Sequence, residues 1–276
     1  MAKTDPAARA KAFKALHERP QPFLIPNPWD VGSAKLLEAL GFEALATTSL
    51  GLANMLGKSG VTREEVIDNL RAICEATSLP VNADLEDGFA AEPRAAAQTI
   101  RLAAEAGASG GSTEDWWRDG KERIYPFNQA VERVQAAVEV ARKLPVPFML
   151  TARAENYLHG RRDLDDTIRR LQAYEKAGAD VLYAPGKFTL DEIRTICTSV
   201  KKPVNVVMGF LDPAFTLEQM GEAGVRRISI GGGLERVARQ AFLDAAREMR
   251  SGRFGFVARM AKVDELHAGF GGKRLA

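Results

Sequence analysis

The segment EKAGADVL, residues 175–182, joins the end of an amphipathic helix to a short apolar strand through one glycine. Glycine readily adopts the left-handed conformation that ends a helix, and the β-branched and aromatic residues that follow favour a strand. The same pattern recurs in EALGFEAL (38–45), AEAGASGG (104–111) and GEAGVRRI (221–228). Three more strands are entered through proline, which halts the preceding helix, in SLPV (78–81), LPVPF (144–148) and KKPV (201–204).

With the first apolar run, FLIPNPW (23–29), the sequence therefore predicts eight strands that alternate with helices. Right-handed helical crossovers make such strands parallel, and eight units indicate a closed (β/α)8 TIM barrel with no sheet edge. An open doubly wound sheet normally has a glycine-rich turn after its first strand, which PNPWDVGS (26–33) lacks. We expect one domain over residues 1–276, with an extra helix (5–18) before the barrel and a C-terminal segment from Gly255 after it.

The composition excludes several classes of partner. The chain has 276 residues, 46% of them hydrophobic, and a net charge of +2, which gives no electrostatic case for binding nucleic acid or an anionic membrane. No apolar run is long enough to span a bilayer or to serve as a secretory signal, so we expect a cytoplasmic protein. Cys74 and Cys197 occupy apolar positions of predicted helices and are interpreted as buried structural thiols.

Acidic residues gather where neighbouring strands end, which is where such barrels carry their chemistry. PVNADLE (80–86) ends in Asp84 and Glu86, and ASGGSTE (108–114) ends in Glu114. Several like charges in a partly desolvated site require a cation or protonation. Strand alternation places Asp84 and Glu86 on one face, with Glu114 on the adjacent strand.

Oxygen ligands without a cysteine or histidine cluster suit a hard ion, so these three residues predict a Mg2+ or Mn2+ site. His17, His159 and His267 are too scattered for a zinc site. The alternative interpretation is that the acids cap helices or are solvated loop charges, which applies best to Asp87 and Asp115.

Four segments together resemble the phosphoenolpyruvate mutase/isocitrate lyase superfamily in order and spacing, over residues 22–250: NPWDVGSAKLLEALGFEALATTSLGLA (27–53), PVNADLEDGFA (80–90), GGSTED (110–115) and LTARAENYL (150–158). The resemblance implies a barrel enzyme that binds Mg2+ and a small 2-oxo acid and breaks or rearranges C–C or C–P bonds through an enolate. It also implies a homo-oligomer, a dimer or tetramer, in which a C-terminal helix is exchanged between subunits.

The resemblance assigns roles to individual residues. It implies that Asp84, Glu86 and Glu114 hold the metal, with Glu86 in place of a second aspartate and Glu114 also serving catalysis. It implies that Arg153 is catalytic and binds a substrate carboxylate, and that the backbone amides of Ser49, Leu50 and Gly51 receive the substrate's acidic head. Asn205 faces the barrel mouth if alternation holds, where it either bonds a substrate oxygen or is a satisfied inner polar residue.

Two departures from the family pattern concern the reaction itself. The loop after the fourth strand reads DWWRDGKERIYPF (115–127) and lacks the Lys-Lys-Cys-Gly-His sequence of the lyases, so the proton-transfer residue is unassigned. Arg118, Lys121 and Tyr125 are candidates for it, and the preferred alternative is that each is a surface or lid residue. Trp116 and Trp117 in this loop form either a lid or an apolar latch. The segment GKSG (57–60) has Lys58 where many relatives have an acid, so Lys58 could instead contact substrate.

The sequence thus favours a Mg2+-dependent lyase or mutase that acts on an oxaloacetate-like or phosphonopyruvate-like 2-oxo acid. One alternative is an aldolase or isomerase for a phosphorylated substrate, which would use the Gly231–Gly233 turn as a phosphate site and Lys187 to form a Schiff base. The other is a barrel that binds 2-oxo acids without catalysis.

Overall fold

The computed structural model describes residues 5–117 and 123–275 and confirms the predicted barrel. Eight strands form one sheet in the order β1-β10-β9-β8-β7-β4-β3-β2, and all their pairings are parallel. The strands are β1 (Phe23–Ile25), β2 (Leu45–Ala46), β3 (Val81–Asp84), β4 (Gly110–Glu114), β7 (Met149–Arg153), β8 (Val181–Tyr183), β9 (Val204–Val207) and β10 (Arg227–Ser229). The Ala46 amide donates to the Pro26 carbonyl at 3.0 Å and so links β2 to the residue that follows β1.

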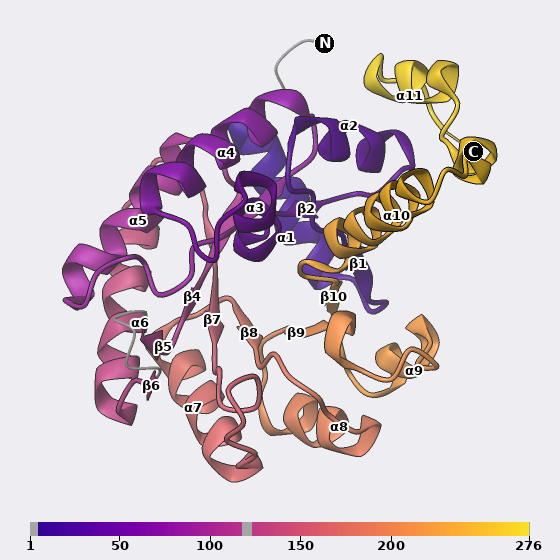
Figure 1. Cartoon of the computed structure of the whole chain (residues 1–276). Helices are drawn as coiled ribbons and strands as arrows, with labels where there is room; N and C mark the ends of the chain where they lie inside the picture. The colour runs from indigo at the N-terminus through magenta and orange to yellow at the C-terminus, as the bar shows by residue number, and fades with distance from the viewer. Residues whose placement is uncertain (1–4, 118–122, 276) are drawn as a thin grey trace.

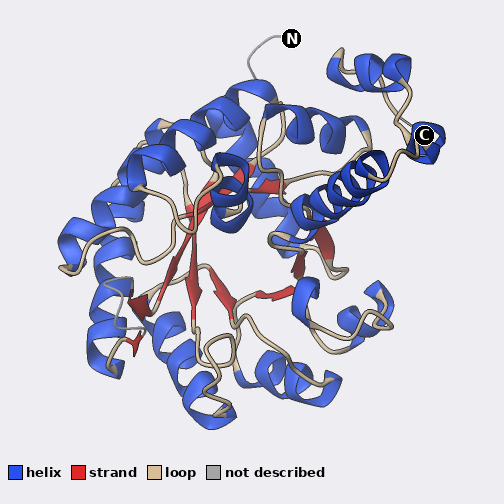
Figure 2. Cartoon of the chain, in the orientation of Figure 1, coloured by secondary structure: helices blue, strands red, loops and turns tan. Residues whose placement is uncertain are grey.

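Helices surround the strands (Figures 1 and 2). They are α2 (Val31–Ala39), α3 (Ser49–Leu56), α4 (Arg63–Ala76), α5 (Pro93–Glu105), α6 (Phe127–Arg142), α7 (Leu164–Ala177), α8 (Leu190–Ser199), α9 (Leu217–Glu222) and α10 (Gly233–Arg250). Gly178 ends α7 in the left-handed conformation, with φ of 107°, as the sequence pattern predicts. Cys74 is buried and Cys197 half-buried, and both are free thiols.

One end of the barrel is closed by the predicted extra helix, α1 (Pro6–Glu18), which begins after the capping side chain of Asp5. Phe13 and Leu16 of α1 pack against Phe23 and Ile25 of β1 in an apolar cluster, with Met149 of β7 at its margin. This cluster fills the end of the barrel at which the strands begin.

The loop after β4 contains an element that the sequence does not predict. The short strands β5 (Trp116–Trp117) and β6 (Arg123–Ile124) pair antiparallel in a sheet of their own. Arg118 and Lys121, two of the candidates for proton transfer, lie outside the described residues.

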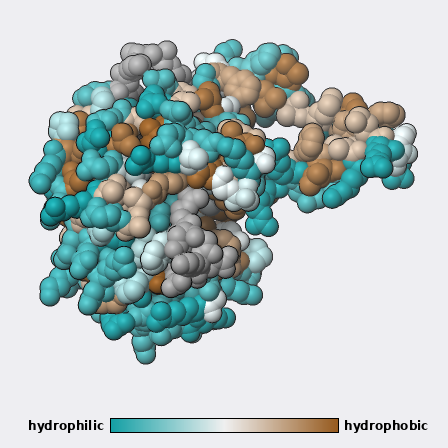
Figure 3. Space-filling view, turned by 60° about the vertical axis from the view of Figure 1, so that its left-hand side comes forward, coloured by the Kyte–Doolittle hydropathy of each residue, from teal (hydrophilic) through white to brown (hydrophobic). Residues whose placement is uncertain are grey.

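The C-terminal region runs out from the barrel along α10 and then returns to its outer surface, where the Leu275 amide donates to the Ala39 carbonyl at the end of α2 at 2.9 Å. Glu235 is the buried residue of α10, whose apolar side chains face outward, and the chain continues through η2 (Gly255–Arg259) to α11 (Val263–Phe270). Figure 3 shows an arm with apolar patches standing out from the body of the molecule. The exposed apolar residues of this region are Val237, Phe242, Leu243, Met249, Phe254, Val257, Met260, Val263 and Phe270. Within the described ranges, no helix is both long and apolar enough to cross a membrane.

Candidate functional site

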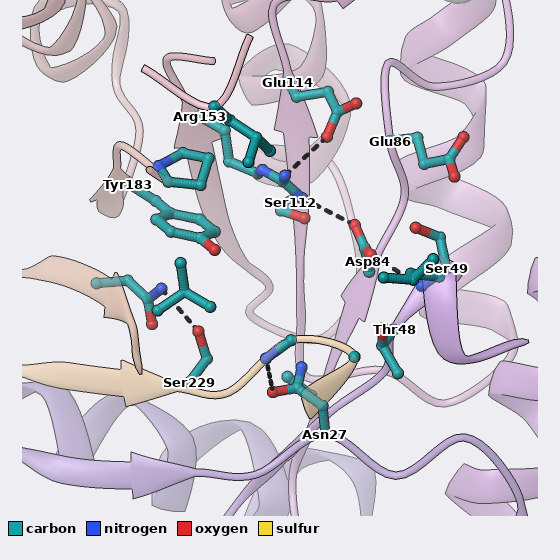
Figure 4. A pocket seen from close by; sticks show the side chains of 18 of the residues that line it. Asn27, Thr48, Ser49, Asp84, Glu86, Ser112, Glu114, Arg153, Tyr183 and Ser229 are labelled. Atoms are coloured by element: carbon teal, nitrogen blue, oxygen red, sulfur yellow. Dashed lines mark hydrogen bonds and ion pairs between the residues drawn. The ribbon is translucent and has the colours of Figure 1, made fainter. Parts of the chain in front are cut away.

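A cavity of about 280 Å³ lies at the end of the barrel where the strands end. Its charged wall comes from the ends of three adjacent strands and the loop that follows one of them (Figure 4): Asp84, Glu86, Glu114 and Arg153. Further polar residues line it, including Asn27, Thr48, Ser49, Asn82, Ser112, Asn205, Arg227 and Ser229. The sequence-predicted residues from separate strands are therefore brought together.

Arg153 is the centre of the charged wall. Its Nη1 lies 3.0 Å from Asp84 Oδ1, its Nη2 lies 3.1 Å from Glu114 Oε2, and its Nε donates to Glu155 Oε1 at 2.8 Å. The Tyr183 ring lies beneath the guanidinium, 5.0 Å from its centre (Figure 4). One arginine thus spans three carboxylates from different positions on the rim.

Burial shifts the pKa values of the charged groups in this cluster. It raises the pKa of Glu114 well above its usual range and raises the pKa of Glu155 to about 7, although Arg153 opposes both shifts. Burial alone would lower the pKa of Arg153, but Glu114, Glu155 and Asp84 outweigh it and raise this pKa well above its ordinary value. Arg153 is therefore always charged, while the carboxylates outnumber it.

The segment predicted to receive an acidic group forms the start of α3. The Ser49 amide donates to Asp84 Oδ2 at 3.0 Å, and the Gly51 amide donates to the capping Thr48 Oγ1 at 3.2 Å. Ser49 and Leu50 line the cavity, whereas Gly51 lies buried one position further into the helix. The helix start therefore faces the cavity, with two of its amides already engaged by side chains.

Glu86 reaches the cavity by a different route from the one that strand alternation predicts. β3 ends at Asp84, and Glu86 lies in the following turn with a left-handed φ of 48°. Phe89, in the same loop, also has a left-handed φ, of 61°. Strained non-glycine backbone of this kind costs about 1–3 kcal/mol and clusters at functional sites. The turn, and not the strand pleat, places Glu86 beside Asp84 (Figure 4).

Asp87 and Asp115 are buried, not solvated loop charges. Asp115 accepts from the Glu155 amide at 2.8 Å, from Arg170 Nη1 at 2.9 Å and from the Tyr174 hydroxyl at 2.6 Å. Tyr125 donates to Asp87 at 3.3 Å. These two acids fix the loops that follow β3 and β4, next to Glu86 and Glu114, and burial raises the pKa of Asp115.

The donor set fits a hard divalent cation in chemistry and charge. The described wall contains oxygen donors and an excess of carboxylates over the single guanidinium of Arg153. Within the described residues, however, no three acidic, histidine or cysteine side chains already converge with metal-ligand geometry, because Arg153 lies between Asp84 and Glu114. The arrangement suits an ion that water helps to coordinate.

Comparison with known proteins agrees with this geometry. The family model described as phosphoenolpyruvate phosphomutase matches residues 13–250. The chain belongs to the phosphoenolpyruvate mutase family. It is 30% identical to 2-methylisocitrate lyase of Escherichia coli, with 78% of this chain and 75% of that one covered.

Two solved structures are similar to this phosphoenolpyruvate mutase family member over nearly its whole length. A protein of Burkholderia cenocepacia J2315 classed as a candidate lyase or mutase is 51% identical, with a TM-score of 0.94 over 98% of this chain and 99% of that one. Phosphonopyruvate hydrolase in complex with oxalate and Mg2+ is 25% identical, with a TM-score of 0.83 over 95% of each chain. The protein is thus an enzyme of the lyase and mutase type.

One residue that lines the site of this phosphoenolpyruvate mutase family member was not predicted from the sequence. His159 lines the cavity, and its ring stacks on Trp116 at 3.3 Å between centroids and 5° between planes. Its Nε2 lies 3.7 Å from Glu155 Oε2. The signal was available in the sequence, since His159 follows Arg153 by six residues in the loop after the same strand.

The two tryptophans have different surroundings, and each matches a different one of the two predicted roles, lid or latch. Trp116 lines the cavity, whereas Trp117 stacks on buried Tyr125 at 5.2 Å between centroids. Tyr125 is fully buried, donates to Asp87 and is not among the described residues that line the cavity, so it is a poor proton donor to a substrate.

Other predicted residues have partners within the protein. Asn205 donates to Ser229 Oγ at 3.1 Å and accepts from Arg227 at 2.8 Å, which matches the inner polar alternative. Lys58 is paired with Glu65 on the surface.

The features of the phosphate-substrate alternative are also engaged or exposed. The Gly231 amide donates to Asn27 Oδ1 at 2.9 Å, and Lys187 is exposed to solvent. Neither feature favours a phosphate site or a Schiff base.

Proposed function

We propose that the protein is a Mg2+-dependent lyase or mutase that breaks a C–C or C–P bond of a small 2-oxo acid, through an enolate. The observation that carries this proposal is Arg153, held among Asp84, Glu114 and Glu155 on the wall of a cavity at the catalytic end of the barrel. A fixed cation among carboxylates can bind an anionic substrate and stabilise the negative charge that develops on it.

The residues would divide the work as follows. Arg153 would exchange part of its bonding to the carboxylates for a fork of hydrogen bonds to a substrate carboxylate. Ser49 and Leu50, at the start of α3, would face an acidic group of the substrate. Asp84, Glu86 and Glu114 would hold Mg2+ or Mn2+, partly through water, and the ion supplies Lewis acidity toward the 2-oxo oxygen.

The bond-breaking step moves electrons in the same way for each candidate substrate. For an oxaloacetate-like acid, the bond between C3 and C4 breaks, its electron pair moves into the C2–C3 bond to give the enolate, and CO2 leaves. The enolate then takes a proton at C3 to give pyruvate. For a phosphonopyruvate-like acid, the broken bond is C–P, and the phosphoryl group is captured by water or returned to the enolate oxygen.

We assign the proton transfer to His159. Burial and the charge of Arg153 lower the pKa of this histidine to about 4, so its ring is neutral at pH 7. The proton for C3 would come from Glu155, 3.7 Å away, whose pKa of about 7 leaves part of it protonated, and His159 would pass that proton to the enolate. His159 and Glu155 would thereby supply an acid/base function in a chain whose loop after β4 does not contain the Lys-Lys-Cys-Gly-His sequence of the lyases.

The relatives support the ligand class. A similar protein holds oxalate and Mg2+ together, and another is a lyase for methylisocitrate. Oxalate resembles the enolate of pyruvate in shape and charge, so a cavity built for it suits the proposed intermediate.

The test is a substrate panel of oxaloacetate, phosphonopyruvate and methylisocitrate, assayed with Mg2+ and with EDTA. We expect turnover of at least one acid, lost with EDTA and restored by Mg2+. His159→Gln should lower kcat while Asp191→Asn, an exposed surface change, should not. No turnover of any acid together with no binding of pyruvate or oxalate by calorimetry would refute the proposal.

We also propose that the exposed apolar face of α10 packs against a second copy of the chain. Phe242 is 65% exposed and Val237 69% exposed on this helix, and a stable fold does not usually leave such a face in water. Light scattering should show a dimer or tetramer for the wild type and a smaller species for Phe242→Glu. A monomeric wild type would refute this part of the proposal.

A further inference from the structure

The barrel interior contains a second arginine that the proposed mechanism does not use. Arg227 of β10 is 3% exposed, yet it lines the same cavity as Arg153. Its Nε donates to Asn205 Oδ1 at 2.8 Å, its Nη2 donates to Thr151 Oγ1 at 2.9 Å, and its Nη1 lies 3.3 Å from His17 Nε2. All three partners are side chains without negative charge.

The histidine partner is neutral by its own geometry. His17 Nδ1 lies 2.8 Å from the Phe13 carbonyl oxygen, which can only accept, so the ring proton is on Nδ1 and the lone pair on Nε2 faces Arg227. Burial, aided by Arg227, also lowers the pKa of His17 to about 3. The imidazole therefore solvates Arg227 without neutralising it.

No carboxylate in the described chain forms an ion pair with Arg227. The acidic group that acts on it electrostatically is Tyr183, and burial raises the pKa of this phenol, so it stays protonated. Burial lowers the pKa of Arg227 to about 9, which still leaves it charged at pH 7. A buried charge without a counter-charge is costly, and proteins rarely keep one without a use.

The surroundings of Arg227 form a polar layer beneath the charged rim. Side chains two residues apart on a strand share a face, so Asn82 lies below Asp84, Ser112 below Glu114 and Thr151 below Arg153. Asn82 is 5% exposed and lines the cavity, and its Oδ1 has no hydrogen-bond partner. This layer thus offers an uncompensated cation together with an unused acceptor for a ligand hydroxyl or a water.

We infer that Arg227 is the counter-charge for a second anionic group of the substrate, in the interior of the barrel beneath Arg153. The inference rests on the proposed function and assigns a residue to the second anionic group of such a substrate. The substrate would be a 2-oxo acid that carries two anionic groups, one held at the rim by Arg153 and one reaching the inner layer. A monoanion such as pyruvate would leave Arg227 without its partner.

The experiment compares a dianionic and a monoanionic probe by calorimetry in the presence of Mg2+: 3,3-difluorooxaloacetate, in which fluorine replaces the hydrogens at C3, and pyruvate. The variants are Arg227→Met and Arg227→Lys, and the matched control is Arg226→Met on the adjacent residue, which is partly exposed and donates to the Val225 carbonyl. Wild type should bind the dianion at least about 10-fold more tightly than pyruvate. Arg227→Met should weaken the dianion about 10- to 100-fold and pyruvate less than about 2-fold, the range expected for a charge-assisted hydrogen bond. Arg227→Lys should retain part of the preference, and Arg226→Met all of it.

The melting temperature without ligand separates binding from a structural role. Removal of the uncompensated charge offsets the loss of its hydrogen bonds to Asn205, Thr151 and His17, so the melting temperature should change little. A clear fall in the melting temperature of Arg227→Met with both probes weakened alike would overturn the inference, as would an unchanged preference for the dianion. In either case binding of both probes by wild type would leave the proposed function standing, whereas no binding of either probe by wild type would remove both.

Discussion

The two ends of the barrel interior are built from the same strands and have opposite chemistry. Along β7 the inward side chains change from Met149 through Thr151 to Arg153, and β3 and β4 change likewise from Asn82 to Asp84 and from Ser112 to Glu114. Where the strands begin, Phe13 of α1 closes an apolar cluster, and where they end, carboxylates surround a cavity. The difference teaches that the apolar end stabilises the fold while the charged end is free to carry the reaction. Packing at the apolar end offsets the cost of keeping like charges close together at the other end.

The largest effect is expected at the open end, from Arg153→Met. The variant loses the cation that spans Asp84 and Glu114 and leaves both carboxylates without it. We expect kcat/KM to fall by at least about 10³-fold, or ~4 kcal/mol of transition-state stabilisation. The control is Arg194→Met, which breaks a surface pair with Asp191. Steady-state kinetics that show a loss below tenfold would contradict the role of Arg153.

Phe13→Ala should produce the next effect, at the closed end. The Phe13 side chain is fully buried between α1 and the strands, so its removal leaves a cavity that costs about 3 kcal/mol of unfolding free energy. Urea denaturation measures the loss, and kcat per folded molecule should stay constant. Leu24→Ala, at a side chain 43% exposed on β1, is the control and should cost under ~1 kcal/mol. A fall in kcat per folded molecule alongside the loss of unfolding free energy would show that the apolar end also supports the reaction at the open end.

The pH dependence of stability should report on His17, which joins the two ends through Arg227. Its pKa is lowered to about 3 in the folded protein, so below pH 6.5 the unfolded chain binds the proton first. The contribution is complete above pH 6.5 and is lost as the pH falls toward 3, with a slope of up to about 1.4 kcal/mol per pH unit. His17→Gln should unfold with a correspondingly flatter profile between pH 6 and pH 4. Identical pH profiles for wild type and His17→Gln would contradict the burial of His17 against Arg227.

A smaller effect is expected from Asn27→Ala, where the first and last strands meet. Asn27 Oδ1 accepts from the amides of Ile230 and Gly231 at 3.0 and 2.9 Å, and its Nδ2 donates to the Thr47 carbonyl at 3.0 Å. Loss of these bonds should cost about 1–2 kcal/mol by thermal denaturation. Asn27→Asp keeps the acceptor but loses the donor to the Thr47 carbonyl and buries a charge, so it should recover only part of the stability, and no difference between the two variants would show that the acceptor contributes nothing.

Much of the site was predictable because barrel geometry converts order along the chain into position in space. Asp84, Glu114 and Arg153 end adjacent strands, so the alternation of strands and helices was enough to place them on one rim. Glu86 was placed beside them for the wrong reason, since a left-handed turn carries it. His159 was missed as a site residue: its place in the loop after β7 was visible in the sequence, but its stacking on Trp116 depends on how that loop folds.

The sequence by itself determined the architecture and the acidic rim, because helix-ending glycines, prolines and strand periodicity are local signals that each segment carries alone. The tertiary structure decided which charges have partners. Only the folded barrel shows that Arg153 joins three carboxylates while Arg227, more deeply buried in the same cavity, meets neutral partners. The physical reason is that a charge is neutralised by what lies beside it in space, and the interior of a closed barrel brings together side chains from every strand.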